Sequence, residues 1–129
     1  MQKIINMEQI RAAGARVDAE YILKARGTSG DQLSGYHSLI ITNGLLATLA
    51  YSADKGEECA AIAKALLGHL SNLQQAKRFP GKALPKNNIL DAIDTISRTA
   101  GTALLAMMTD ECMAYLNYLK RFVRAIKNS

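Results

Sequence analysis

The chain has 129 residues, a net charge of +5 and 49% apolar residues, and these values exclude several classes of protein. The length suits one domain with a buried core. A charged fraction of 21% is too low for a disordered chain, and no uncharged apolar run is long enough for a transmembrane helix. The first residues also lack the apolar run of a signal peptide, so we expect a cytoplasmic protein.

The two cysteines, Cys59 and Cys112, lack the spacing of a disulfide framework. Both fall at core-facing positions of predicted helices. We therefore expect buried free thiols in a reducing compartment.

Basic residues are concentrated in two segments that contain no acidic residue. Residues 59–90 carry a charge of +5 and residues 112–129 a charge of +4, whereas residues 1–58 sum to −1 and residues 91–111 to −3. A solvated helical surface normally mixes both signs. Unmixed basic segments are typical of proteins that bind an anionic partner, although exposed Lys and Arg are often only solvated.

The hydrophobic pattern predicts five helices and no sheet. The first helix is expected over residues 2–26. Its apolar stripe would be Met7, Ile10, Ala13, Gly14, Val17 and Tyr21. The second is expected over residues 36–53. Within it, Asn43-Gly44 is an irregularity that close approach by a neighbouring helix would explain.

The third helix is expected over residues 57–77, with Lys64 on its polar face. Its buried stripe would be Cys59, Ile62, Leu66, Leu70 and Leu73. Residues 79–86 hold both prolines, which predict the principal loop because proline lacks the amide donor of a helix interior. Asn87 or Asn88 can cap a fourth helix that runs to about Met108.

The last helix is expected to begin at Thr109, because threonine is a good N-cap. Asp110 and Glu111 would then suit the positive end of the helix dipole. The apolar face of this helix would comprise Cys112, Tyr115, Leu116, Leu119, Phe122, Val123 and Ile126.

Four cations of this helix gather on its outer side. Lys120, Arg124 and Lys127 follow at i, i+4 and i+7 and predict one exposed line, with Arg121 at its flank. The expected architecture is therefore all-α: a single-domain bundle of about five helices spanning residues 1–129.

The sequence offers no recognisable catalytic or metal-binding constellation. His37, His69, Cys59 and Cys112 are possible ligands, but no two stand at metal-ligand spacing. An all-helical ribonuclease of the higher-eukaryote-and-prokaryote nucleotide-binding type would need an arginine before its catalytic histidine, and Lys64 stands there before His69. We expect a protein that is not an enzyme and uses neither a cofactor nor a metal.

Two stretches resemble a known family. The first runs Tyr36-His-Ser-Leu-Ile-Ile-Thr-Asn-Gly-Leu-Leu-Ala-Thr-Leu-Ala-Tyr51, and Lys55-Gly56 follows it. The second runs Glu111-Cys-Met-Ala-Tyr-Leu-Asn-Tyr-Leu-Lys-Arg-Phe122. With the helix order, they resemble the small helical subunit of the type III-B (Cmr) CRISPR effector complex. Tyr118 departs from the tryptophan that is frequent in the family, and the loop over residues 80–85 is not a family hallmark.

The resemblance implies a non-catalytic structural subunit for antiviral defence, present in several copies, that contacts guide and target RNA and bridges neighbouring subunits. Cations on a rigid helix neutralise phosphates without selecting bases, as a complex that serves many guides requires. The low aromatic content argues against base stacking as the main mode of binding. We expect the RNA backbone to contact Lys120, Arg121, Arg124 and Lys127, with Lys24, Arg16, Lys82 and Lys86 as further candidates.

The alternative function is that of a helical protein–protein adaptor without direct RNA contact. Its basic faces would then meet acidic patches on protein partners. Neither hypothesis involves a membrane.

Overall fold

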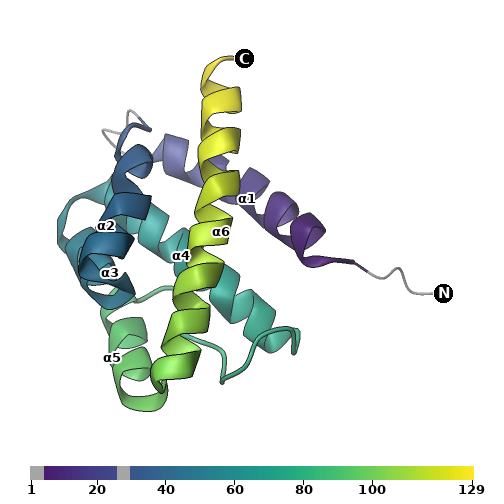
Figure 1. Ribbon diagram of the computed structural model, residues 1–129. Helices are drawn as coiled ribbons and strands as arrows, with labels where there is room; N and C mark the ends of the chain where they lie inside the picture. Colours follow the sequence, from purple (N-terminus) through teal and green to yellow (C-terminus); the bar gives the residue numbers. More distant parts are fainter. Residues whose placement is uncertain (1–4, 26–29) are drawn as a thin grey trace.

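The computed structural model describes residues 5–25 and 30–129, and every regular element in them is helical (Figure 1). The α-helices are α1 (Met7–Lys24), α2 (Tyr36–Asn43), α3 (Leu45–Asp54), α4 (Glu57–Gln75), α5 (Ile89–Thr99) and α6 (Thr102–Lys127), and a short 3₁₀ helix, η1 (Gln32–Gly35), precedes α2. The all-α class is confirmed, with six α-helices in these residues instead of about five. None of these helices could cross a membrane.

Helix α4 is the centre of the fold. It contacts α1, α3, α5, α6 and η1, so almost every turn of it meets a neighbour. The stripe predicted for it is buried and comprises Cys59, Ile62, Leu66, Leu70 and Leu73. Complete burial of one such aliphatic side chain contributes about 1.5–3 kcal/mol, and α4 buries more residues than any other helix in the described residues.

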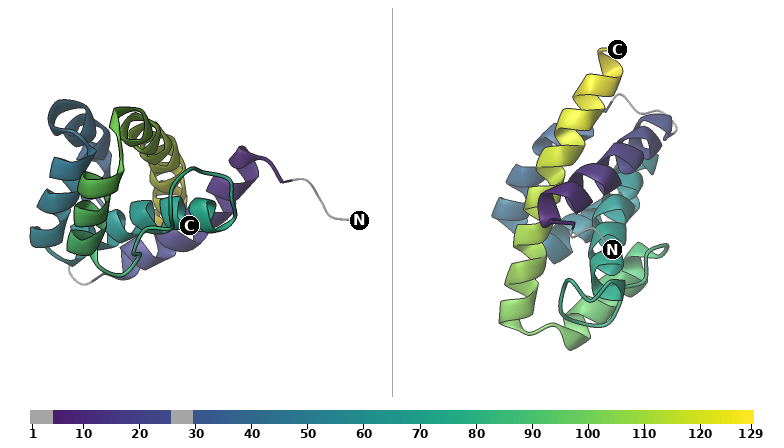
Figure 2. Two further views of the ribbon diagram at one scale, coloured as in Figure 1. Left: turned by 90° about the horizontal axis from the view of Figure 1, so that it is seen from below. Right: turned by 90° about the vertical axis from the view of Figure 1, so that its right-hand side faces the viewer.

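Helix α1 crosses α6 closely (Figures 1 and 2) because Gly14 has no side chain. A Cβ at Gly14 would lie 2.8 Å from the hydroxyl oxygen of Tyr115. That separation is shorter than any ordinary van der Waals contact, so glycine is needed for the crossing.

The stripe predicted for α1 was wrong for several of its members. Val17 and Tyr21 are 55% and 72% exposed, and Ala13 is exposed as well. The side that faces α4 and α6 instead buries Ala15, Ala19 and Ile22. Apolar residues lie on both sides of this helix, so periodicity could not select the buried one, and the close crossing favours alanine.

Helix α1 also begins later than predicted. Asn6 and Gln9 form a capping box, in which each side chain accepts a hydrogen bond from the other residue's backbone N–H at 2.9 Å. This pair satisfies donors that the first turn leaves unpaired, so it fixes the start at Met7. The parts of the prediction that concern residues 1–4 and Arg26 lie outside the described residues.

The predicted second helix is two helices that meet at Gly44. This residue has φ +90° and ψ 163°, a conformation that is essentially restricted to glycine. A Cβ at Gly44 would meet no atom within 4 Å, so the explanation by close approach of a neighbour was wrong. Glycine is required here by its backbone angles, which separate α2 from α3.

The boundary between the last two helices lies at Gly101, not at Thr109. Gly101 is the N-cap of α6, and the preceding Ala100 has extended backbone angles. Thr109 lies inside α6, where its hydroxyl donates to the carbonyl of Leu105 at 2.8 Å. Because a threonine hydroxyl can bond within a helix as well as cap one, the residue type alone misplaced the boundary.

Residues 76–88 connect α4 to α5 as a loop, as the two prolines predicted. Gln74 holds this loop against α4. Its amide nitrogen donates to the carbonyl of Pro80 at 3.1 Å, and its amide oxygen accepts from the backbone N–H of Leu84 at 3.0 Å. Leu84 is buried, and Asn88 then caps α5 through the N–H of Asp91.

We expect Gly44→Ala to lower the free energy of unfolding by about 1–3 kcal/mol, because alanine is strained at φ +90°. Gly68→Ala is the matched control. It lies within α4, and an added Cβ meets no atom within 4 Å, so we expect a gain of up to about 1 kcal/mol. Urea denaturation measures both. Equal changes in the two variants would contradict the assignment of strain to Gly44.

Candidate functional site

A buried ionic cluster joins three helices behind the basic end of α6. Glu111, near the middle of α6, accepts hydrogen bonds from Arg11 Nε and Nη2, both at 2.8 Å. His69 Nε2 of α4 lies 2.8 Å from Glu111 Oε2. Because a carboxylate only accepts, this His69 nitrogen carries the proton and donates it. The expectation that Glu111 lies at a helix N-terminus was therefore wrong.

The pKa of Glu111 is held at about 2 by these partners. Burial raises this pKa. The hydrogen bonds from Arg11 and His69, together with the positive charge of these partners, lower it by more than burial raises it. Glu111 is therefore ionised in the folded chain at any physiological pH. A bidentate Arg–carboxylate pair fixes geometry as well as charge, so it sets how α1 lies against α6.

Tyr115 extends this cluster along the same helices. Its ring stacks on the His69 ring, with centroids 3.9 Å apart and an angle of 7° between the planes. Its hydroxyl donates to Asp18 of α1 at 2.5 Å. Burial, followed by the charge of Asp18, raises the pKa of Tyr115, so the hydroxyl keeps its proton and remains a donor.

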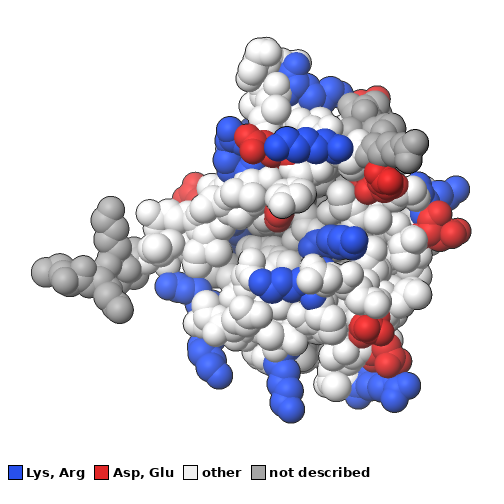
Figure 3. All heavy atoms as spheres, turned by 180° about the vertical axis from the view of Figure 1, so that it is seen from behind, with Lys and Arg blue, Asp and Glu red and all other residues white. Residues whose placement is uncertain are grey.

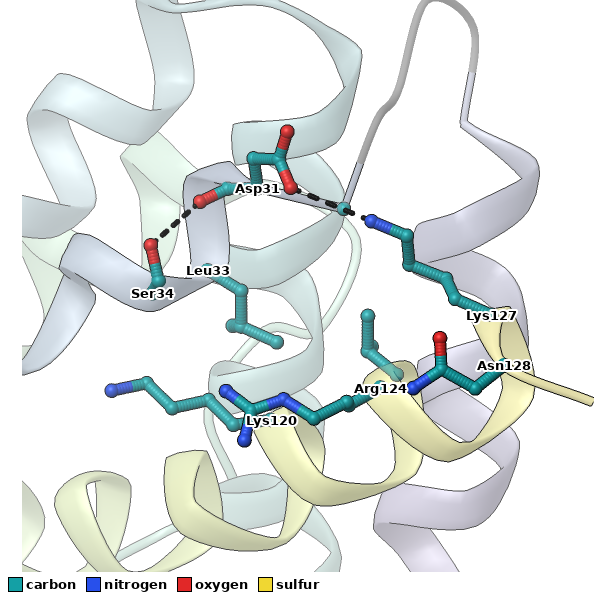
Figure 4. A pocket seen from close by; sticks show the side chains of 9 residues that line it. Asp31, Leu33, Ser34, Lys120, Arg124, Lys127 and Asn128 are labelled. Atoms are coloured by element: carbon teal, nitrogen blue, oxygen red, sulfur yellow. Dashed lines mark hydrogen bonds and ion pairs between the residues drawn. The ribbon is translucent and has the colours of Figure 1, made fainter.

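Three of the predicted RNA-binding cations line a pocket of about 180 Å³ between η1 and the end of α6 (Figure 4). Lys120 and Arg124 extend alongside each other from α6. Lys127 turns to Asp31, with its Nζ 3.4 Å from the Asp31 carboxylate. The structure brings these cations together, but Lys120 is half-buried, so they do not form the fully exposed line that was expected.

His37 of α2 positions Lys120. Its Nε2 lies 3.0 Å from the carbonyl oxygen of Met113, which only accepts, so this nitrogen carries the proton. Its Nδ1 is then left to accept from Lys120 Nζ at 2.6 Å. Burial, and then the charge of Arg124, lower the pKa of Lys120. The negative charge of a bound anion would raise this pKa, so anion binding and the charged form of Lys120 favour each other.

Arg121 lies on the outer side of α6, away from this pocket. It is exposed, as is Arg124, and neither side chain forms a hydrogen bond or an ion pair with a residue that the structure describes. These two guanidinium groups are therefore available to a ligand without disrupting the fold.

A second basic site lies on the face formed by α1 and α4. A groove of about 880 Å³ runs there and is lined by Lys24, Lys64 and Lys86, with Tyr21 and Asp18. Figure 3 shows Lys and Arg side chains around a hollow on the back of the molecule. The sequence named Lys24 and Lys86, but it missed Lys64 as a member and assigned Tyr21 to the core.

The two remaining candidates, Arg16 and Lys82, line neither site. Arg16 pairs with Glu20 one turn along α1, at 2.5 Å, on the exposed surface. Lys82 is exposed on the loop that follows α4. That Arg16 and Lys82 contact RNA stays a prediction.

Within residues 5–25 and 30–129, no three His, Cys, Asp or Glu side chains group as a metal site would. Cys59 and Cys112 are free thiols in the core, as predicted. Burial raises the pKa of Cys112, so it remains a neutral, unreactive thiol.

Comparison with known families agrees with this arrangement. A family model described as CRISPR-associated protein (Cas_Cmr5) matches residues 7–126. The chain belongs to this family. Cas_Cmr5 proteins are the small subunit of the type III-B CRISPR complex, which confirms the resemblance found in the sequence. No curated protein and no solved structure matches the chain.

Membership of the Cas_Cmr5 family makes the chain a structural subunit that associates with other subunits of the complex. The position of His69 fits that assignment. The side chain is only 3% exposed, between Glu111 and Tyr115, so a phosphodiester could not reach it for cleavage.

We expect Glu111→Gln to lower the free energy of unfolding by about 3 kcal/mol at pH 7 and by about half as much at pH 3. The pKa of Glu111 falls from an ordinary 4.5 to about 2 on folding, so its contribution is complete above pH 4.5 and is lost as the pH falls toward 2. Urea denaturation at both pH values measures this difference.

The matched control is Asp94→Asn, which removes an exposed i,i+4 pair with Arg98. We expect a change of no more than about 0.5 kcal/mol at either pH. A Glu111→Gln effect of the same size at pH 7 and pH 3 would show that the charge of Glu111 is not what stabilises the fold.

Proposed function

We propose that the chain is a single-domain, non-catalytic subunit, present in several copies in a cytoplasmic type III-B CRISPR ribonucleoprotein, that contacts the RNA backbone and bridges neighbouring subunits. The observation that carries this proposal is the basic end of α6, where Lys120, Arg121 and Arg124 lie on one helix. The ionic cluster at Glu111 fixes the middle of that helix, so its cations are presented from a rigid element.

These cations suit phosphates in particular. Guanidinium groups bind phosphate oxygens in bidentate fashion, and Lys120 adds a point charge that His37 orients. Backbone contacts position a nucleic acid without selecting its bases. Contact of this kind is what a subunit needs if its complex is to accept any guide and its complementary target.

Bridging is supported by a charge-free surface. Residues 36–53, which form α2 and all of α3 except its last residue, Asp54, contain no Asp, Glu, Lys or Arg. Ile41 is nevertheless 74% exposed in this stretch, and Leu90 of α5 is 65% exposed. Depletion of charge around exposed apolar side chains is typical of the centre of a protein–protein interface.

We expect Arg121→Gln/Arg124→Gln to weaken RNA binding and to reduce the slope of log affinity against log salt concentration by about 1.4–1.8. Each lost phosphate contact removes about 0.7 of slope for single strands and about 0.9 for duplexes. Titration of fluorescent RNA of two unrelated sequences measures the slope, and both sequences should respond alike.

Lys55→Gln/Arg98→Gln is the control, because it removes the same charge from exposed residues, Lys55 at the C-cap of α3 and Arg98 of α5. It should leave the slope unchanged. An equal decrease of the salt slope in both variants would show that the effect comes from net charge and not from the position of Arg121 and Arg124. If neither variant changes RNA binding while other subunits co-purify after nuclease digestion, the adaptor alternative replaces RNA contact.

We expect Ile41→Arg to reduce the co-purification of other subunits by about tenfold or more, because it places a charge where an apolar contact of about 1.5–3 kcal/mol is buried. The stability of the free chain should change by less than about 0.5 kcal/mol, since Ile41 is exposed. Ser97→Arg adds the same charge to the exposed side of α5 and should have no effect. If both variants recover the other subunits equally, α2 is not part of the interface.

A further inference from the structure

The groove between α1 and α4 has the shape of a site for a flat ligand. Its floor consists of small residues of α4: Ala60, Ala61, Ala65 and Gly68. Its volume of about 880 Å³ falls within the range of about 300–1,000 Å³ in which proteins bind small molecules and cofactors. A nucleotide fits within that volume, and the small side chains leave room for a planar base.

One aromatic ring stands at this groove. Tyr21 projects from α1 with 72% of its surface exposed, and it forms no hydrogen bond or ring contact with any residue that the structure describes. Val17, one turn earlier on α1, is also exposed. An unpartnered ring beside an apolar floor is a platform on which a base stacks.

The edges of the groove carry positive charge. Lys24 and Lys64 form no ion pair within 4.0 Å in the described part of the chain, although the charge of Lys24 acts on Glu20 one turn earlier in α1. Lys86 Nζ donates to Asn72 Oδ1 at 2.5 Å. The acids at the groove are Asp18 and Glu57. Asp18 accepts a hydrogen bond from the Tyr115 hydroxyl, so one of its carboxylate oxygens is already engaged within the fold.

These features distinguish between two kinds of occupant. A protein helix in this groove would remove three lysines from water, which is costly without matching acids. A nucleic acid supplies phosphates to the lysines and a base to the ring. In a duplex both faces of each base are already stacked, so only an unpaired nucleotide offers a face to Tyr21.

We propose that the groove between α1 and α4 binds one unpaired nucleotide of single-stranded RNA, with its base on Tyr21 and its flanking phosphates on Lys24, Lys64 and Lys86. This inference rests on the proposed function, since the ligand is RNA in both. It adds a second site that is separate from the end of α6 and that recognises the absence of pairing. The amides of Asn72 and Asn87 also line the groove and can donate to base edges.

The test compares two forms of one RNA. A fluorescein-labelled single strand of mixed sequence, and the same strand annealed to its complement, are titrated with the full chain. Tyr21→Ala should weaken binding of the single strand by about fivefold to 100-fold, the range for loss of one stacked base, and leave duplex binding unchanged. Tyr21→Phe keeps the ring and should bind as the wild type does.

Tyr51→Ala is the matched control. Tyr51 is also exposed, but it lies on α3 with Lys55 over its ring, at 5.5 Å from the centroid. This variant should retain the affinity for both RNA forms. Thermal unfolding of Tyr21→Ala should match the wild type, because Tyr21 is 72% exposed. Tyr51 is only 38% exposed, so Tyr51→Ala should unfold at a lower temperature but still be folded under the conditions of the titration.

A second variant tests the phosphate contacts. Lys24→Gln/Lys64→Gln/Lys86→Gln should reduce the salt slope for the single strand by about 1.4, because one nucleotide has two flanking phosphates and each contributes about 0.7. Tyr21→Ala should leave this slope unchanged, because it removes no cation. The combined pattern identifies one site that binds both a base and its phosphates.

Three outcomes would overturn the inference. If Tyr21→Ala binds the single strand as the wild type does, or binds both RNA forms more weakly by the same factor, the groove does not recognise an unpaired base. The proposed function would still stand in that case, provided that Arg121→Gln/Arg124→Gln reduces RNA binding. If Tyr21→Ala loses co-purified subunits and keeps its RNA affinity, the groove binds protein. If the wild type binds neither RNA form, the inference and the proposed RNA contact fail together.

Discussion

The carboxylate of Glu111 is the point on which the arrangement of the helices depends. It lies near the middle of α6 and is bonded by Arg11 of α1 and His69 of α4, each at 2.8 Å. Removing Arg11 or His69 would leave part of the buried carboxylate without a hydrogen-bond donor. The free-energy cost of such an unpaired buried group is far larger than the contribution of an exposed ion pair. The three helices therefore have one way to pack in which every member of the cluster is satisfied.

Both basic sites follow from this packing. With α1 held against α4 and α6, residues of α1 and the small residues of α4 border one groove. Lys24 and Lys64 line this groove although they are far apart in the sequence. At the other end, α6 continues past its contacts with α1, and its last turns form a pocket with η1. A rigid core thus presents two cationic surfaces.

Patterns within one helix predicted the fold well where a single face is apolar. The buried stripe of α4 and the apolar face of the C-terminal half of α6 were found from periodicity, because core-facing positions repeat every turn. The exposed face of α1 was assigned to the core because Val17 and Tyr21 have helical spacing, and spacing alone does not say which apolar side a neighbour covers. The start of the last helix was likewise placed at Thr109, because a threonine hydroxyl can bond the backbone both at a helix N-terminus and inside a helix.

By itself, the sequence determined the all-α class, the order of the helices, the segregation of basic charge and the resemblance to the family, since these depend on residues close together in the chain. Only the tertiary structure decided which cations share a site. Lys120 is bound to His37, Lys127 is turned to Asp31, and Lys64 joins Lys24 and Lys86. These contacts join residues of different helices, and their positions are set by the crossing of α1, α4 and α6 around Glu111, which no local pattern encodes.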